Sequence, residues 1–368
     1  MMMKDPDYFL KKLNCSISPR HLTDLKRDVW NDDPLPITFS FQDKASVHAE
    51  IAYRGAHTRK AKKKSYFIQN AQGNKGKSER EFHLNAEFYD PSFMRNALSF
   101  IFLKEIGLIV PHAEYVKFFM NGKYEGVYLK LESVNEDFAE KQNLSPCSII
   151  YAVDGDANFS LYSDLDRSLK KSLLQGYELK SGKKSAMTRL TEFILFTNTA
   201  SHHEFESRIS DYMNVRQYLT WLAGVVCLQN FDGFVHNYGL ILKEETGQFM
   251  IIPWDYDATF GRDVNGIDMG AEYVRLEGFN TLSARLLAIE SFREMYAGLM
   301  RTLLAGSFTI DALSPAIDDL YGLLEKAVET DPYTGKYMKE FTQEPDFIKA
   351  FIQARNTYLS AELSKKGW

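Results

Sequence analysis

The stretch that decides the fold is "LQNFDGFVHNYGLIL", residues 228–242, read together with "WDYDATFG", residues 254–261. Asp232 and Asn237 lie just before a short apolar strand, and Asp255 follows a second one. The two strands, "YGLIL" and "FMIIP", flank the polar turn "KEETGQ", which predicts a β-hairpin. Because a hairpin returns the chain to the end where it started, we expect these polar side chains to converge.

Carboxylate and amide oxygens that converge in this way repel one another unless a cation lies among them. Such hard oxygen ligands suit Mg²⁺ or Mn²⁺ and do not suit zinc. A carboxylate outside the metal's coordination shell can accept a proton from a nucleophile. Phosphoryl transfer needs this division: an Asp that deprotonates a hydroxyl, and an Asn and a second Asp that hold the metal.

The order of these residues is that of protein kinases, in which a catalytic Asp precedes an Asn by five positions and a hairpin ends in Asp-Phe-Gly. Asp232 and Asn237 have that spacing, and Asp255 ends the hairpin. Two departures are evident: Asn-Phe precedes Asp232 where kinases have His-Arg, and "WDYDATFG" replaces Asp-Phe-Gly. Each residue alone is more often a turn cap, but their joint occurrence favours a catalytic site. The role of Asp257 stays open: it is either a second metal ligand or a cap for the segment that follows.

A basic segment, "RGAHTRKAKKKSYF", residues 54–67, leads into a predicted strand and is the candidate contact for nucleotide phosphates. Its candidate side chains are Lys64, Lys63 and Arg59. The segment has one glycine, so it is neither a Walker A loop nor a glycine-rich loop. Most basic runs are solvated surface. The strand period leaves Lys64 and Lys63 both open, with Lys64 slightly preferred.

Composition limits the remaining classes of function. The 368 residues include 44 Lys and Arg and 49 Asp and Glu, a net charge of −5 that gives no reason to expect a nucleic-acid partner. No run reaches the roughly 18 apolar residues of a membrane span. The N-terminal "MMMKDPDYFLKKLN" lacks the apolar core of a signal peptide, so we expect synthesis in the cytosol without secretion.

Hydrophobic periodicity predicts an α+β protein of two lobes. Residues 1–133 form a β-rich lobe with hairpins and one helix that opens at Asp90; the clearest hairpin turns at Asn121-Gly122. Residues 134–368 form a mainly helical lobe that carries the Asp and Asn motif. The polar stretch 176–188 is predicted to be a mobile loop.

Several long motifs together resemble the spore coat protein H family (CotH), in particular its Bacillus-type members. The motifs that carry the resemblance are "AYRGAH", "KKSY", "HLNAEFYDPSFMRNALS", "NGKYEGVYLKLES", "YAVDGDANFSL", "NFDGFVHNYGLIL", "IPWDYDATFGRD" and "GFNTLSARLL". The resemblance spans the chain from about Pro19 to Leu359. It implies a kinase-like fold of two lobes, with an antiparallel-sheet small lobe and a mainly helical large lobe.

The resemblance also implies an atypical protein serine kinase that uses ATP with Mg²⁺ or Mn²⁺ on serine-rich spore coat proteins. Asp232 would be the catalytic base, Asp255 the principal metal ligand and Asn237 its assistant. The lysines of "KKSY" would contact the nucleotide phosphates. The protein would reach the spore coat from the mother-cell cytoplasm.

Two alternatives stay open: a catalytically silent scaffold for coat assembly, and a metal-dependent phosphohydrolase. The intact Asp and Asn positions disfavour the scaffold, and the basic segment disfavours the hydrolase. The sequence does not indicate the target serines, the preferred metal, autophosphorylation or the oligomeric state.

Overall fold

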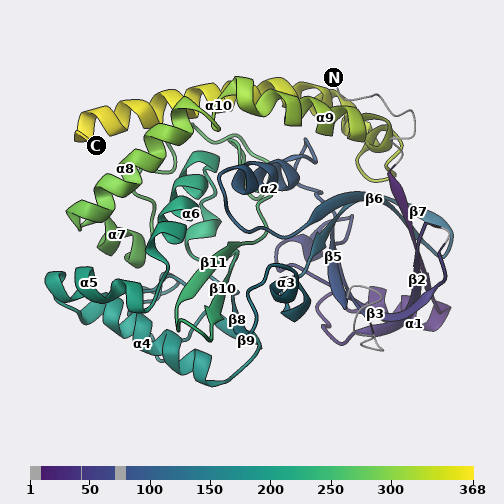
Figure 1. Ribbon diagram of the computed structural model, residues 1–368. Helices are drawn as coiled ribbons and strands as arrows, with labels where there is room; N and C mark the ends of the chain where they lie inside the picture. Colours follow the sequence, from purple (N-terminus) through teal and green to yellow (C-terminus); the bar gives the residue numbers. More distant parts are fainter. Residues whose placement is uncertain (1–9, 43, 71–79) are drawn as a thin grey trace. The chain divides into compact units, whose positions relative to one another are not determined.

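The structure, a computed structural model, describes residues 10–42, 44–70 and 80–368 (Figure 1). The chain forms two compact units. The small unit comprises Met1–Ala97, His112–Ser133 and Ile317–Pro345, and the large unit comprises Leu98–Pro111, Val134–Ala316 and Asp346–Trp368. The predicted division after residue 133 coincides with one boundary between the units. Two segments lie across it, because residues 98–111 belong to the large unit and residues 317–345 to the small one.

The small unit is built on a closed barrel with strand order β1-β2-β3-β4-β5-β7-β6 (Figure 1). Its strands are β1 (Lys11–Ile17), β2 (Leu35–Phe41), β3 (Val47–Tyr53), β4 (Tyr66–Gln69), β5 (Glu81–Asn85), β6 (Ala113–Met120) and β7 (Lys123–Glu132). Neighbouring strands are antiparallel except for β1 and β6, whose parallel pairing closes the barrel. Closure leaves no unpaired strand edge in the barrel, which protects it from pairing with other chains.

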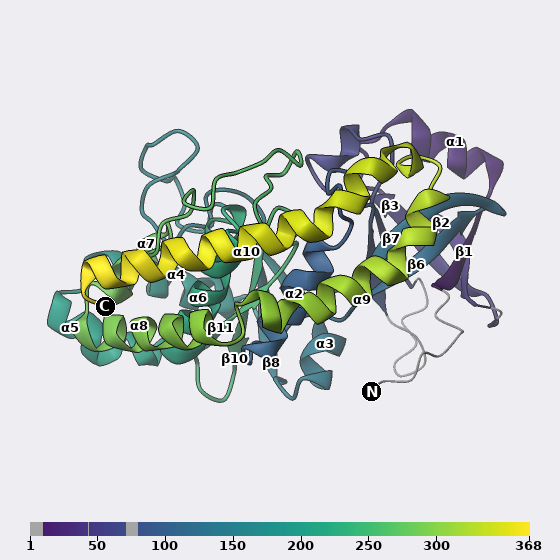
Figure 2. The same ribbon diagram turned by 90° about the horizontal axis from the view of Figure 1, so that it is seen from above.

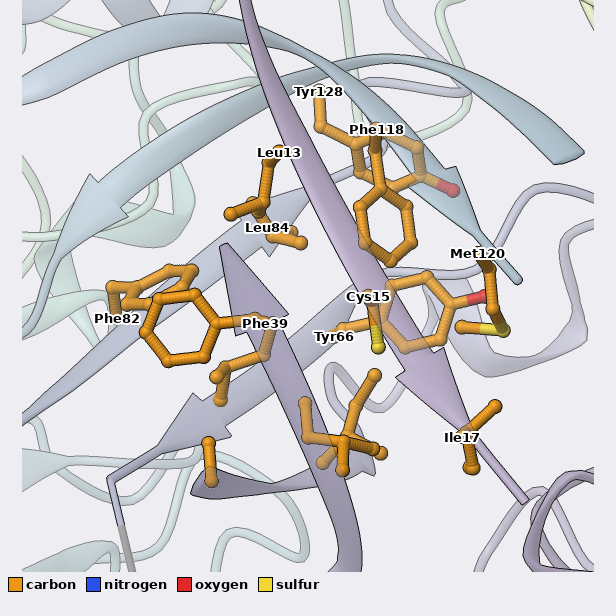
Figure 3. Close-up of a cluster of buried hydrophobic side chains, with 14 of the residues drawn as sticks. Leu13, Cys15, Ile17, Phe39, Tyr66, Phe82, Leu84, Phe118, Met120 and Tyr128 are labelled. Carbon is orange, nitrogen blue, oxygen red and sulfur yellow. The ribbon is translucent and has the colours of Figure 1, made fainter. Parts of the chain in front are cut away.

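The interior of the barrel is filled by apolar side chains that alternate along each strand (Figure 3). On β1, for example, Leu13, Cys15 and Ile17 point inward while the intervening residues do not. Phe39 and Phe82 meet edge to face with ring centroids 5.5 Å apart. This period of two is the strand pattern from which the sequence predicted a sheet-rich lobe.

The predicted hairpins of the small unit are confirmed. Strands β6 and β7 pair around Asn121 and Gly122, whose φ angles of 50° and 76° are both positive, as a type I′ turn requires. Strands β2 and β3 also pair as predicted, although residue 43 of their turn lies outside the described residues. Helix α1 (Pro19–Arg27) begins with Ser18 as its N-cap.

One predicted boundary in the small unit is wrong. Helix α2 (Arg95–Glu105) does not open at Asp90 but begins later in the chain. The Asp90 carboxylate instead accepts hydrogen bonds from the backbone N–H groups of Ser92 and Arg95, at 2.8 and 2.9 Å. Phe93, with φ 58°, turns the backbone between them and delays the helix.

The large unit contains a 4-stranded sheet of order β11-β10-β8-β9. Its strands are β8 (Cys147–Ala152), β9 (Tyr177–Ser181), β10 (Tyr238–Lys243) and β11 (Phe249–Pro253). The predicted β10–β11 hairpin is confirmed. The prediction of a mobile loop at 176–188 is wrong, because this stretch contains strand β9. The strand forms by pairing with β8, a partner that its short polar sequence does not indicate.

Helices make up most of the rest of the large unit. They are α3 (Glu136–Lys141), α4 (Ser185–Thr199), α5 (His202–Arg208), α6 (Val215–Leu228), α7 (Thr281–Leu287), α8 (Glu290–Ala305), and parts of α2, α9 (Ile310–Glu329) and α10 (Met338–Lys366). The C-terminal part of α10 runs beside α8, and Asn356 donates to the carbonyl oxygens of Leu304 and Phe308, at 2.8 and 2.7 Å (Figure 2).

The chain passes between the units inside helices α2, α9 and α10, and also after residues 111 and 133. The boundaries after residues 316 and 345 fall in α9 and α10, beside or at Pro315 and Pro345. A proline inside a helix removes one backbone hydrogen bond, so these are the weakest turns of the two helices. No helix among the described residues is both long and apolar enough to cross a membrane. With a sheet-based small unit and a mainly helical large unit, the chain is an α+β protein, as predicted.

Candidate active site

Asn237 and Asp255 lie next to each other at the outer end of the β10–β11 hairpin. Tyr238 lies opposite Pro253, so the next residue outward on each strand sets Asn237 opposite Trp254, directly before Asp255. The Trp254 N–H donates to the Asn237 carbonyl oxygen at 3.0 Å, and Asn237 Nδ2 donates to the Asp255 carbonyl oxygen at 3.3 Å. The carboxamide and the second carboxylate therefore lie at the same end of the hairpin.

Both of these residues have a left-handed backbone, with φ 57° at Asn237 and 56° at Asp255. Residues other than glycine seldom adopt this conformation, and Asp or Asn does so at the lowest steric cost. Such strained positions cluster at functional sites, where the surrounding structure holds them. The left-handed turn ends β11 at Pro253, so the strand does not continue through Asp257 and cannot give Asp255 and Asp257 a common strand face.

Asp232 stands at the start of a short turn between α6 and β10. Helix α6 ends at Gln229 in a left-handed cap with φ 59°. The Asn230 side-chain oxygen then accepts the Gly233 N–H at 3.0 Å, which fixes the turn that begins at Asp232. The Asp232 side chain is one-quarter exposed, and its Oδ2 lies 3.7 Å from Nε2 of His236, the residue before Asn237. Contacts thus link Asp232 through His236 and Asn237 to Asp255.

A buried tyrosine anchors the segment after the hairpin. Tyr256 is fully buried and its hydroxyl accepts the Trp221 indole N–H at 3.0 Å. Its neighbours Asp255 and Asp257 are both half-buried. Because Tyr256 points into the core between them, the backbone that carries both carboxylates is held in place. The structure leaves the role of Asp257 open.

The oxygen atoms of Asp255 and Asn237 suit a hard divalent cation whose remaining ligands are water and substrate phosphates. Among the described residues, no group of three or more His, Cys, Asp or Glu side chains could hold a metal ion alone. Mg²⁺ is usually bound by one or two carboxylates while water and substrate phosphates fill the rest of its shell. Asp255 and Asn237 supply that kind of partial set, and the hydrogen bond to the Asp255 carbonyl oxygen uses the Asn237 amide nitrogen and not its oxygen.

The basic segment lies in the small unit, and the structure gives its candidate side chains different surroundings. Lys63 is fully buried, with its Nζ 2.8 Å from the Asp331 carboxylate and also bonded to the Val127 carbonyl oxygen. Its ammonium lies 4.6 Å from the ring centre of Tyr128. Burial lowers the pKa of Lys63, and the Asp331 carboxylate opposes that shift. Because Lys63 is shielded from solvent, the side chains around it would have to move before its ammonium could contact a nucleotide.

Arg59 is also committed within the small unit. Its guanidinium donates to the carbonyl oxygens of Gly55, Val29 and Tyr53, at 3.1, 3.0 and 3.0 Å, and pairs with Asp32. These bonds shape the loop between β3 and β4.

Of the three candidate side chains, Lys64 has the surroundings that best suit a contact with a ligand. It is half-buried, and its Nζ donates to the Arg59 carbonyl oxygen. Partial burial lowers the pKa of Lys64. Because its ammonium is partly accessible, Lys64 needs less rearrangement than Lys63 to meet a phosphate.

Two positions that shape these sites were not found from the sequence. Asp331 lies 268 residues after Lys63 and carries no local motif that would link the two. Asn230 precedes Asp232 by two residues and could have been identified as a turn former, because Asn side chains commonly accept nearby backbone N–H groups.

Comparison with known proteins places the chain in a class. Residues 51–359 match the family model described as CotH kinase protein, and the chain belongs to that family. It is 47% identical over 348 residues to the inner spore coat protein H of Bacillus subtilis (strain 168), covering 95% of this chain and 96% of that protein. It is 29% identical over 306 residues to an inner spore coat protein H-like protein of the same organism, covering 83% and 87%.

A solved structure is similar at a much lower level. The proinflammatory kinase CtkA of Helicobacter pylori matches 81% of this chain and 95% of its own, with 12% identity and a TM-score of 0.36. No functional inference follows from so loose a correspondence. The family prediction is confirmed by the family model and by the relatives from Bacillus subtilis.

Proposed function

We propose that the protein is an atypical protein serine kinase, dependent on ATP and on Mg²⁺ or Mn²⁺, that phosphorylates serines of spore coat proteins during coat assembly. One observation carries the proposal: the Asn237 side chain is hydrogen-bonded to the Asp255 backbone at the outer end of the hairpin, and Asp232 begins the turn that leads to Asn237. Membership of the CotH kinase protein family supports the same reading.

Each residue has a distinct role in the proposed reaction. Asp232, whose carboxylate is partly exposed, accepts the proton of the acceptor serine hydroxyl as that oxygen bonds to the γ-phosphorus, while the bond to the β–γ bridging oxygen breaks and ADP leaves. Asp255 and Asn237 would hold the divalent cation. When bound, this cation neutralises negative charge on the phosphates. The strained backbone at both ligands keeps their oxygens in place before substrate arrives, which is how enzymes avoid a reorganisation cost during reaction.

Lys64 is the proposed contact for the nucleotide phosphates, because it is the more accessible of the two candidate lysines. Lys63 is then a structural residue that joins the barrel to Asp331. A lysine acts on phosphate as a point charge, so a partly accessible ammonium meets the requirement without a fixed geometry.

The place of action that we propose is the spore coat, which the protein reaches from the mother-cell cytoplasm. The family and the name of the 47% identical relative support this. Serine-rich coat proteins would be the acceptors.

The test is transfer of labelled γ-phosphate from ATP to purified spore coat proteins, with Mg²⁺ or Mn²⁺ present. Wild type should label serine, and Asp232→Asn should lower the rate by about 10²- to 10⁴-fold. Asp255→Asn should also lose transfer. The matched control is Asp211→Asn, which removes a carboxylate that is 60% exposed on the large unit and should leave transfer unchanged.

The outcomes separate the three hypotheses. Labelled serine that depends on Asp232 and Asp255 supports the kinase. Labelled phosphate released to water without acceptor labelling would indicate a phosphohydrolase. No nucleotide turnover by folded wild type, with any coat protein, would leave only the scaffold.

A further inference from the structure

The residue before Asp232 belongs to a cluster of three aromatic side chains on the large unit. Phe231, the residue directly before Asp232, has its ring centroid 5.6 Å from that of Tyr273 and 5.2 Å from that of Phe279. Phe231 is 39% exposed and Tyr273 is 52% exposed. Phe231, Tyr273 and Phe279 are called the aromatic platform below. Large rings that are left accessible in a packed cluster mark a recognition surface more often than an isolated exposed ring does.

The segment that carries Tyr273 is held firmly by the helices of the large unit. Arg355, which is fully buried on α10, donates to the Ala271 carbonyl oxygen at 2.6 Å. The Tyr296 hydroxyl on α8 donates to the Leu276 carbonyl oxygen, also at 2.6 Å. Tyr273 therefore lies between two anchored positions. A surface fixed in this way loses little conformational entropy when a partner binds.

Phe279 is fixed from the other side of the platform. The Arg275 guanidinium lies 4.8 Å from the Phe279 ring centre, and its Nε donates to the Gly278 carbonyl oxygen at 2.6 Å. Phe279 also packs edge to face on Phe234, whose ring is fully buried. The platform thus continues inward to the apolar core and outward to solvent at Phe231 and Tyr273.

We propose that the aromatic platform binds a bulky apolar side chain of the acceptor polypeptide close to the serine that is phosphorylated. The proposal rests on the proposed function, because it takes Asp232 as the group that meets the acceptor hydroxyl. Phe231 and Asp232 are consecutive, so their Cα atoms are about 3.8 Å apart. An extended acceptor advances about 3.3 Å per residue. A side chain one to three positions from the serine therefore falls within reach of the platform.

The charge of the surrounding segment favours an acceptor chain as the occupant. Residues 255–280 hold six acidic and two basic residues, a net charge of −4. Arg262 pairs with Asp268 at 2.8 Å, and Glu277 pairs with Lys366 of α10 at 2.6 Å, so the charge that remains on the segment is still negative. An acidic partner would be repelled here, whereas a segment that combines basic and apolar side chains is attracted.

A second exposed tyrosine of the large unit provides the control. Tyr162 is 55% exposed, close to the value of Tyr273, but no aromatic contact links it to the platform among the described residues. It belongs to the loop between β8 and β9, where the Tyr162 N–H donates to the Ser160 hydroxyl oxygen at 3.0 Å. Tyr162→Ala therefore removes an equally exposed ring without changing the platform.

The experiment uses synthetic serine peptides with constant lysine content and a single leucine or alanine, scanned through the three positions on each side of the serine. Binding to the full chain is measured by fluorescence anisotropy, and phosphate transfer is measured on the same peptides. At one or more positions, leucine should bind wild type about tenfold more tightly than alanine, the effect of partly burying one leucine side chain. Tyr273→Ala should abolish most of that difference, and Tyr162→Ala should preserve it.

Failure of this inference differs from failure of the proposed function. If leucine and alanine peptides bind equally at every position, or if Tyr273→Ala and Tyr162→Ala behave alike, the platform is not a recognition site, whatever the transfer rate. If leucine peptides bind selectively but none receives phosphate, the kinase activity is refuted, and with it the identity of the bound segment as an acceptor.

Discussion

Replacing Lys63 by methionine should destabilise the small unit severely. Lys63 and Asp331 are both fully shielded from solvent and lie 2.8 Å apart. Methionine keeps most of the volume that packs on Tyr128 but removes the ammonium, so the Asp331 carboxylate stays buried without its cation. Removing one member of a buried ion pair costs about 3 to 5 kcal/mol. Hydrogen bonds to Asp331 from backbone groups such as the Val127 N–H, at 2.9 Å, moderate the loss without replacing the charge.

Urea unfolding followed by circular dichroism measures this cost. With a slope of about 2 kcal/mol per molar, the midpoint for the small unit should fall by about 1.5 to 2.5 M. Lys62→Met is the matched control, because Lys62 is exposed in the same segment and should change stability by less than about 0.5 kcal/mol. The double variant Lys63→Met/Asp331→Asn should lose less than the sum of its single variants. Equal midpoints for Lys63→Met and Lys62→Met would refute the structural role of the pair.

Three further predictions concern the small unit. Burial alone would raise the pKa of Asp331, but the lysine ammonium and two backbone N–H groups outweigh it and hold the pKa below its ordinary value of 3.8. As pH falls, the Asp331 carboxylate therefore takes up a proton in the unfolded chain before it does so in the folded protein. The stabilisation from Asp331 is complete above about pH 3.8 and is lost below it, which acid unfolding of wild type compared with Asp331→Asn would show. Gly126→Ala should lower the free energy of unfolding in urea by about 2 kcal/mol or more, because φ is +109° and the new Cβ would lie 2.2 Å from Asp331 Oδ2. Gly122→Ala, where φ is +76° and the space is open, should lower it by about 1 kcal/mol. Equal losses for the two variants would contradict the clash at Gly126. Lys64→Met should raise the KM for ATP about tenfold or more at nearly unchanged stability, whereas an unaltered KM, matching Lys62→Met, would remove Lys64 from the nucleotide site.

Local signals explain what the sequence predicted correctly. The Asn121-Gly122 turn and the "KEETGQ" turn each join adjacent strands, and the alternation on both sides is visible within about ten residues. The contact between Asn237 and Asp255 is local in the same sense, since the hairpin between them brings both residues to one end.

Features that depend on distant segments could not be predicted. The closure of the barrel pairs Leu13 of β1 with Phe118 of β6, more than 100 residues away, and nothing in either strand specifies the partner. Residues 317–345 complete the small unit from the far end of the sequence, which is why Asp331 was missed as the partner of Lys63. The late start of α2 depends on side-chain bonds to Asp90 that override the helical period.

In the proposed reaction, Asp255 and Asn237 hold the cation that binds ATP, while Asp232 acts only on the acceptor hydroxyl. Calorimetric titration of ATP into Asp232→Asn and Asp255→Asn, with and without Mg²⁺, separates these roles most directly. Asp232→Asn should bind ATP about as tightly as wild type and only when the metal is present, and Asp255→Asn should lose that metal-dependent binding. Binding that is equal with and without Mg²⁺, or that survives in Asp255→Asn, would contradict the assignment.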